Sequence, residues 1–324
     1  MSATSVPPPT DGPRATGHAF APVDWALFAG IAGIWGASFL FIAIGLEAFS
    51  PGVVTLLRVG LGALTLNLLP GPRIRVDPAD RLRVVALSVL WVGIPFTLFP
   101  IAEQHITSAV TGLLNGAMPL FTALFAALFF GTRTSGVQLV GVGVGFLGVV
   151  AISIPSAGEG SSEAWGVALV VLATVCYGLA INIAAPLQAR YGSRPLMARM
   201  LLLATLWTLP YGLVGIPSSS LALAPVVAVA VLGLVGTGLA FLIMGTLVGR
   251  VGSTRASFIT YLIPVVALVL GVVVQDEEVA PLALLGVVLV IGGALLASRA
   301  ERPRPAPPGA PHDGGPGAGH PARP

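Results

Sequence analysis

Long apolar runs separated by short polar breaks fill almost the whole sequence. Crossing about 30 Å of hydrocarbon takes about 20 residues of α-helix, and ten runs have that length. They lie at residues 25–45, 52–70, 84–101, 108–130, 136–154, 164–185, 195–215, 225–247, 254–274 and 281–298. The breaks at Pro51, Gly131 and Pro281 are so short that the neighbouring runs must form antiparallel hairpins. The pattern predicts an all-α membrane protein with ten transmembrane helices.

Composition agrees with a chain that has lipid as part of its solvent. Of 324 residues, 55 % are hydrophobic and 9 % charged, against roughly 25 % charged in a soluble domain. The 16 basic residues are all arginine and are scattered in small groups, which argues against the continuous basic face of a nucleic-acid-binding protein. Cys176, the single cysteine, lies inside an apolar run and is expected to be a buried small hydrophobe. A disulfide framework or thiolate metal site within the chain is therefore excluded.

The arginines also predict the direction of the spans, because short loops rich in arginine stay in the cytoplasm. With the N-terminus inside, fifteen arginines fall on the inner side: Arg14, Arg73, Arg75, Arg81, Arg83, Arg133, Arg190, Arg194, Arg199, Arg250, Arg255, Arg299, Arg302, Arg304 and Arg323. The outer side carries only acidic charges: Glu47, Glu103, Glu159, Glu163, Asp276, Glu277 and Glu278. One missed span would scramble this alternation. We therefore expect a multi-pass protein of the bacterial inner membrane with both termini cytoplasmic.

Two polar tails flank the spans. Residues 1–24 are rich in proline and lack the apolar core of a secretory signal, and residues 299–324 are rich in Pro, Gly and Ala. Both are expected to be disordered cytoplasmic extensions.

The sequence contains a weak internal repeat. A shift of 145 residues superposes six identical pairs: Ser108 on Ser253, Pro119 on Pro264, Leu139 on Leu284, Gly141 on Gly286, Val142 on Val287 and Gly148 on Gly293. The same shift lays the short hairpin at 131–136 over that at 276–281. This predicts two domains of five spans each, 25–154 and 164–298. Since five is odd, the second half is inverted in the membrane, a geometry that can enclose a central cavity open to either side in turn.

Several segments resemble the drug/metabolite transporter superfamily, in particular its EamA-type members. They are the motif WGASF at 35–39, the segment from Pro51 to Arg58, and the paired segments 107–150 and 253–296. The resemblance covers about residues 25–298 and implies ten helices, cytoplasmic termini, and export or exchange of metabolites, amino acids or drugs. Family members usually carry Gly-Glu at the hairpin tips. Here the second tip has Asp276-Glu277 and the first Gly131-Thr132, which argues against a charge-based role for the first tip.

Arg58 is the one arginine within a span. It lies about seven residues into the second span, roughly 10 Å below the outer surface at 1.5 Å per residue. A guanidinium at that depth is costly unless it faces protein or a water-filled cavity. Two interpretations stay open: Arg58 is a functional group, or it is structural, reaching the headgroups or pairing with Glu47 or Glu103.

The other candidates for a solute site are polar or aromatic groups in spans that the repeat relates. They are Trp35 and Ser38 in the first span, Tyr177 and Asn182 in the sixth, Asn115 in the fourth, and Thr260 and Tyr261 in the ninth. Each has a structural alternative, because aromatic rings often only pack and polar groups often bond to neighbouring helices. If transport is coupled to protons, the candidates are Glu103, His105 and Glu277.

Glycines and prolines have predicted structural roles. Gly141, Gly145 and Gly148 in the fifth span, and Gly286, Gly292 and Gly293 in the tenth, allow close helix packing within one chain or between the protomers of a homodimer. Pro119 and Pro264 can kink the fourth and ninth spans.

The sequence has no HExxH motif, phosphate loop, nucleophile elbow or metal cluster, so we expect no enzyme, no metal and no cofactor. The expected partners are a small-molecule solute and the lipid bilayer, with no nucleic acid. The preferred function is a secondary transporter, an exporter working by alternating access. Because a single arginine lies in a span, an amphipathic or zwitterionic solute is favoured over a phosphorylated one. One alternative is a non-transporting scaffold or receptor. Another is a channel, which the absence of any ring of charge in the spans argues against.

Overall fold

The computed structural model describes residues 21–69, 75–130 and 135–297. The predicted C-terminal tail and all but the last four residues of the predicted N-terminal tail lie outside these ranges, as does the first hairpin tip at Gly131-Thr132. Eight long apolar helical spans cover Pro22–Leu46, Pro51–Leu68, Pro78–Ala102, Ser108–Phe129, Gly136–Pro155, Ser161–Tyr191, Ser193–Ser218 and Leu223–Val251, and two shorter ones cover Ile259–Gln275 and Pro281–Ala297. The predicted all-α fold with ten spans is confirmed.

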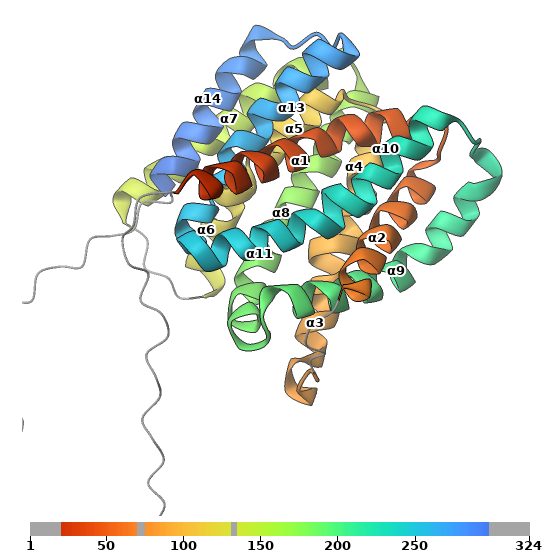
Figure 1. Cartoon of the computed structure of the whole chain (residues 1–324). Helices are drawn as coiled ribbons and strands as arrows, with labels where there is room; N and C mark the ends of the chain where they lie inside the picture. Colours follow the sequence, from red (N-terminus) through yellow and green to blue (C-terminus); the bar gives the residue numbers. More distant parts are fainter. Residues whose placement is uncertain (1–20, 70–74, 131–134, 298–324) are drawn as a thin grey trace, which may run out of the picture.

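Several spans are built from more than one element (Figure 1). In chain order the elements are α1 (Pro22–Leu46), α2 (Pro51–Leu68), η1 (Pro78–Asp80), α3 (Arg81–Leu87), η2 (Ser88–Gly93), α4 (Ile94–Ala102), α5 (Ser108–Asn115), α6 (Met118–Phe129), α7 (Gly136–Glu159), α8 (Ser161–Tyr191), α9 (Ser193–Gly215), η3 (Ile216–Ser218), α10 (Leu223–Gly233), η4 (Leu234–Leu239), α11 (Ala240–Val251), α12 (Ser253–Ala256), α13 (Ile259–Gln275) and α14 (Pro281–Ala297). Of the short elements, η1 and η3 are 3-10 turns, whereas η2 and η4 are π-helical.

Local sequence explains where the spans begin. The Ser50 side chain accepts a hydrogen bond from the Val53 nitrogen, and Pro51, which has no N–H to leave unsatisfied, is the first residue of α2. Thr107 caps α5 in the same way. Ser135 and Gln138 form a reciprocal capping box at the start of α7. These polar residues mark the helix ends because each satisfies donors that the first turn leaves free.

Glycines bring α7 and α14 together along their length, and the two helices lie side by side in Figure 1. A Cβ atom built on Gly293 would lie 2.4 Å from the Gly145 nitrogen, and one built on Gly148 would lie 2.6 Å from the Gly286 oxygen. Only residues without a side chain permit this approach. The glycine stripes therefore pack helices within one chain, and homodimer formation stays a prediction.

The two prolines have different effects. The fourth span is interrupted between Asn115 and Met118, where α5 ends and α6 begins, and Pro119 occupies the first turn of α6. Its ring cannot supply the N–H that would continue the α5 ladder. Pro264, by contrast, lies inside α13, which runs on without a break. Both members of the repeat are interrupted, the ninth span at residues 257–258 between α12 and α13, but only in the fourth span does the proline lie directly after the break.

The π-helical segments are a second feature that the halves share. A shift of 145 residues maps η2 onto residues 233–238, within one residue of η4. A π-helical turn inserts one residue into a helix, turning the side chains on either side of it. The third and eighth spans are therefore distorted at matching depths, which supports the duplication predicted from sequence.

Candidate functional site

Arg58 is buried in the membrane-spanning part of α2, with 6 % of its surface exposed. Its guanidinium carbon lies 3.8 Å from the centre of the Phe96 ring on α4, and its Nε donates a hydrogen bond of 3.3 Å to Thr237 Oγ1 in η4. Among the described residues no carboxylate lies within ion-pair distance of Arg58. The ion pair with Glu47 or Glu103 is therefore not formed, and the Arg58 side chain is enclosed by protein.

The π-helical segment η4 presents Thr237 to Arg58. The Thr237 hydroxyl donates to the Leu232 carbonyl at 3.1 Å, five residues earlier, which leaves its oxygen free to accept from the guanidinium. On α2, one turn from Arg58, Gly62 leaves room for Thr237: a Cβ atom there would lie 2.6 Å from Thr237 Cγ2. The first half therefore supplies the arginine, and the second half supplies its hydrogen-bond acceptor.

Glu103 follows directly after α4, just beyond the third span. Both of its carboxyl oxygens are buried and have no hydrogen-bond partner in the described part of the chain. Burial raises the pKa of this carboxyl well above its usual range, the nearby Glu277 carboxylate raises it further, and Arg58 opposes both by attraction. A carboxyl group left unpaired in this way is costly, and such groups mark functional candidates.

Aromatic rings surround the region between these charges. The Tyr177 ring on α8 lies 5.9 Å from that of Phe99 on α4, and Phe99 lies 5.6 Å from Phe39 on α1. Tyr177 lies within electrostatic range of Arg58. The structure therefore brings Arg58, Glu103 and Tyr177 from the predicted set into one neighbourhood. Phe96, Phe99 and Thr237 were not predicted, because their role depends on contacts between separate spans.

Of the remaining predicted site residues, Asn115 alone keeps an unpaired buried polar atom. Its Oδ1 has no partner among the described residues and lies where α5 ends. Asn182 instead donates to the Thr122 carbonyl at 3.0 Å and to the Gly178 carbonyl at 2.9 Å. Asn115 thus differs from Asn182 in keeping one buried acceptor unpaired.

The other predicted residues are engaged locally or with neighbouring helices. Ser38 and Thr260 donate to carbonyls three or four residues earlier, at Ile34 and Ser257. Tyr261 donates to the Ala294 carbonyl at 3.2 Å. The Trp35 ring packs edge-on against Phe241 at 5.9 Å. These residues therefore pack or bond within the helix bundle, as the structural interpretation of each predicts.

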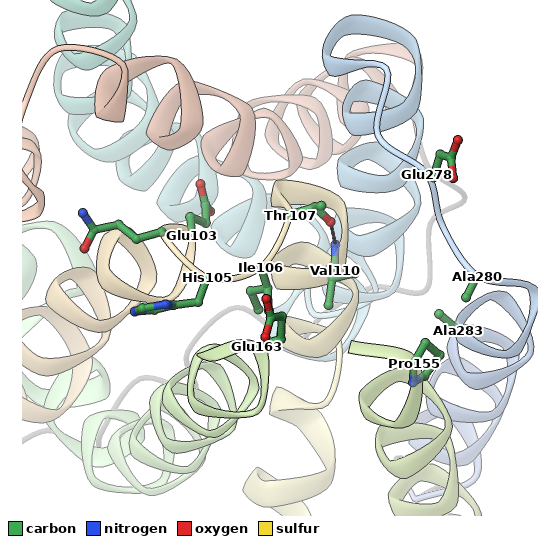
Figure 2. A pocket seen from close by; sticks show the side chains of 11 residues that line it. Glu103, His105, Ile106, Thr107, Val110, Pro155, Glu163, Glu278, Ala280 and Ala283 are labelled. Carbon is green, nitrogen blue, oxygen red and sulfur yellow. Dashed lines mark hydrogen bonds between the residues drawn. The ribbon is translucent and has the colours of Figure 1, made fainter. Parts of the chain in front are cut away.

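A cavity of about 400 Å³ opens beside Glu103 (Figure 2). Its lining is Glu103, Gln104, His105, Ile106, Thr107, Val110, Pro155, Glu163, Glu278, Ala280 and Ala283. The Nδ1 atom of His105 lies 2.7 Å from Ser162 Oγ. In Figure 2 the Glu103 carboxyl group points away from His105 and Glu163, toward the interior of the helix bundle. The cavity thus forms a polar vestibule, with the unpaired carboxyl on its inner side.

Polar contacts join the two halves at the face where α1 begins, called here the arginine face. Arg250 at the end of α11 pairs with Asp24 in the first turn of α1. Asp80 accepts from Arg190 at 2.7 Å and from the Tyr191 hydroxyl at 2.8 Å. Each of these contacts connects a residue of the first half with one of the second.

Other contacts join the halves at the opposite, glutamate face, which carries Glu103, Glu163 and Glu278. Glu277 Oε1 accepts from the Ser108 nitrogen at 2.9 Å and from its hydroxyl at 2.7 Å. Oε2 accepts from the Ala109 nitrogen at 2.7 Å. Glu277 therefore caps the first turn of α5, and the structure is fastened at both faces.

The turn that places Glu277 explains the hairpin-tip residues. Asp276 has φ 52° and ψ 31°, the left-handed conformation that glycine adopts most easily and that aspartate tolerates. The turn brings the Glu277 nitrogen to the Gly271 carbonyl, at 3.1 Å. A Gly-Glu tip would serve this geometry, with the first residue making the turn and the second capping α5.

Comparisons with known proteins agree with this architecture. The EamA-like transporter family matches residues 24–154 and again residues 164–299. A protein of Streptantibioticus cattleyicolor named a probable terminal-alkyne amino-acid exporter is 30 % identical over 85 % of this chain and 93 % of its own length. The Escherichia coli uncharacterized inner membrane transporter YedA is 27 % identical over 89 % and 94 %. An Escherichia coli protein named a probable amino-acid metabolite efflux pump is 25 % identical over 80 % and 89 %.

One solved crystal structure shares the fold, with a TM-score of 0.60 at 20 % identity, covering 85 % of this chain and 96 % of that one. The family match covers both halves and nearly all of the spans. The protein is therefore a multi-pass membrane transporter and not an enzyme. The chain belongs to the EamA-like transporter family.

Proposed function

We propose that this protein is a secondary transporter that exports a small metabolite, amino acid or drug-like solute by alternating access between its two halves. The observation that carries the proposal is the fastening of the halves at both faces around unpaired polar groups. Arg58 is buried within the second span, between the two faces, and the Glu103 oxygens are buried at the inner side of the glutamate face. Solute sites are mostly apolar with a few placed polar groups, and charged groups inside the membrane mark functional candidates.

Alternating access then has a structural description. Opening the arginine face requires the Asp24–Arg250 and Asp80–Arg190 pairs to separate. Opening the glutamate face requires Glu277 to leave the start of α5. In the present structure both sets are formed, as in an occluded state between the two openings.

We further propose that the protein resides in a bacterial inner membrane with both termini in the cytoplasm. The arginine distribution supports this orientation, because the arginine face then faces the cytoplasm. The name of the YedA relative, an inner membrane transporter, supports the compartment. Export as the direction is supported by the names of the two relatives described as an exporter and an efflux pump.

Among the residues proposed for proton coupling, Glu103 is the strongest. Its carboxyl is unpaired and has a raised pKa. Glu277 is engaged in three hydrogen bonds and His105 lies against Ser162, so both are better explained as structural groups. We expect a Glu103→Gln variant to lose the effect of an imposed proton gradient on transport, and a His105→Gln variant to keep it.

The test is an untargeted metabolite comparison of cells that overexpress the protein or its Arg58→Ala variant, followed by efflux from reconstituted vesicles. The exposed Arg81 provides a matched control variant, Arg81→Ala, which makes the same chemical change outside the candidate site. A solute exported by the native protein and the control but not by Arg58→Ala is the expected result. If the reconstituted protein moves no solute from a broad panel and co-purifies with a stable partner, it is a scaffold or receptor and the proposal is wrong.

A further inference from the structure

We propose that a groove between the third and seventh spans binds one acyl chain of a membrane phospholipid, with the ester group of the lipid at Tyr211. The groove has a volume of about 360 Å³. One wall is formed by η2 and α4 of the first half, between Val89 and Leu98, and the other by Trp207, Thr208 and Tyr211 on α9 of the second half. An occupant of the groove therefore contacts both halves of the transporter.

The groove lies at the depth of the hydrocarbon of one leaflet. Leu98 lies four residues before the glutamate-face end of its span, Tyr211 seven residues and Val89 thirteen. At 1.5 Å per residue, the lining covers depths of roughly 6–20 Å below that face. One leaflet contributes about half of the 30 Å of hydrocarbon in a bilayer. The groove therefore runs beside the acyl chains of the leaflet on the glutamate side.

The polar side chains of the groove, apart from Tyr211, are satisfied within the protein. The Thr97 and Thr208 hydroxyls donate to carbonyls four residues earlier, at 2.7 Å and 2.9 Å. The Trp207 indole nitrogen donates to Ser88 Oγ at 3.2 Å and so connects the two walls. The described lining contains no charged residue. These groups leave no donor for an occupant, which favours an apolar one.

The groove is continuous with the lipid-facing surface of α9. Trp207 and Tyr211 line it and are nevertheless 56 % and 39 % exposed, and Leu206, Leu213 and Val214 on the same helix are exposed as well. An unfilled groove would leave its walls without van der Waals contacts on one side. Water is a poor substitute, because it needs several polar partners. A lipid chain is thus the occupant that the surroundings supply.

Tyr211 distinguishes a phospholipid from an apolar guest without ester groups. Its hydroxyl has no hydrogen-bond partner in the described part of the chain, and it lies on the wall nearer the glutamate face than Trp207. Gly52 on α2 leaves room for its ring, since a Cβ atom there would lie 3.2 Å from Tyr211 Cδ1. Tyrosine suits this level because its ring is apolar and its hydroxyl reaches polar groups. The hydroxyl is therefore available to donate to an ester carbonyl.

The matching contact in the repeat is closed. The repeat relates α9 to α2 and η2 to η4. Where α2 packs on η4, a Cβ atom built on Gly62 would lie 2.6 Å from Thr237 Cγ2, and one built on Gly233 would lie 2.6 Å from Leu61 Cβ. Glycines thus bring these two helices together, whereas the large Trp207 ring borders the other crossing. The groove is therefore a particular feature of the α9 side and not a requirement of the duplicated fold.

Native mass spectrometry of the purified full-length protein in dodecyl maltoside measures the binding of each added lipid. The probe is palmitoyl-oleoyl phosphatidylglycerol. We expect the first lipid to bind about tenfold more tightly than later ones, as for one specific site among weak surface contacts. A phosphatidylglycerol that carries a diazirine on its acyl chain should then label peptides of α4 and α9.

Leu98→Trp fills the groove and should abolish the preference for the first lipid. Leu213→Trp is the matched control, because it makes the same change on the exposed surface of α9, five residues from the end of its span and outside the groove. It should bind like the native protein.

Tyr211→Phe tests the ester contact with little change in packing. The native protein should bind the ester-linked lipid about threefold to tenfold more tightly than its ether-linked analogue, as for one hydrogen bond. Tyr211→Phe should bind both equally. Because this preference is a ratio within one variant, a lower folded fraction does not change it.

Four results would overturn the proposal: no lipid bound more tightly than the rest, equal binding by the native protein and Leu98→Trp, labelling confined to other helices, or equal native affinity for the ester and ether forms. A native dimer that Leu98→Trp dissociates would show that a second copy occupies the groove, and the proposal would again be wrong. None of these outcomes depends on transport, so they leave the proposed function to its own test.

Discussion

Replacing Glu277 by alanine removes the side chain that fastens the second half to the start of α5. Its two oxygens accept from the Ser108 nitrogen at 2.9 Å, the Ser108 hydroxyl at 2.7 Å and the Ala109 nitrogen at 2.7 Å. These are charge-assisted bonds at a helix N-terminus, where a negative charge is favourable. The adjacent Glu278 is exposed and provides a control with the same chemical change one residue away.

The expected loss follows from the number and kind of these bonds. A hydrogen bond to a charged group contributes about 1.5–3 kcal/mol, but the bonds share one carboxylate and are not additive. Thr107 still caps α5 through the Val110 nitrogen, which limits the damage. We therefore expect Glu277→Ala to lower the free energy of unfolding by about 2–4 kcal/mol. Glu277→Gln, which keeps one acceptor oxygen, should lose about half as much.

Equilibrium unfolding in mixed micelles of dodecyl maltoside and dodecyl sulfate, followed by tryptophan fluorescence, measures these free energies. Glu278→Ala should lie within about 0.5 kcal/mol of the native protein, as is usual for an exposed site. If Glu277→Ala is no less stable than Glu278→Ala, the capping contact does not stabilise the fold and the reasoning is refuted.

Four further outcomes are expected. Gly293→Ala should lower the free energy of unfolding by about 1–3 kcal/mol through overpacking against Gly145. At Gly292 a Cβ meets nothing within 4 Å, so Gly292→Ala should be neutral or slightly stabilising. Equal effects in the same unfolding assay would contradict the packing of α7 on α14. Asp276→Gly should stabilise by a few tenths of a kcal/mol to about 1 kcal/mol, because φ 52° suits glycine; a loss would show that the Asp276 side chain contributes more than the turn. Asp24→Asn removes the ion pair with Arg250. It should raise the labelling rate of a cysteine placed at Gly33, where a Cβ meets nothing within 4 Å. Unchanged labelling would argue against a gate at the arginine face. Efflux driven by an imposed proton gradient should be kept below the raised pKa of Glu103 and fall as pH rises through it, since only the protonated carboxyl carries a proton; the same dependence in Glu103→Gln would show that another group is responsible.

Much of the fold is predictable because its signals are local. Hydrocarbon thickness sets the length of each span, so the apolar runs located all ten helices, with ends marked by residues such as Pro51 and Pro281. The repeat predicted from the 145-residue shift is supported by the matching π-helical segments. Of its two matched prolines, only Pro119 lies at a helix break, whereas Pro264 lies inside a helix. The sequence does not predict which proline interrupts its helix, because that depends on what packs against the helix.

The sequence by itself determined the class, the number of spans and the position of one buried charge, Arg58. Hydropathy and charge act on each segment separately, so these properties need no knowledge of which helices meet. Only the tertiary structure decided that Arg58 lies against Phe96 and Thr237, the latter 179 residues away in the chain. It also decided that the Glu103 oxygens face no donor. Contacts between distant spans depend on how whole helices pack, and that packing placed two unpaired opposite charges in one neighbourhood.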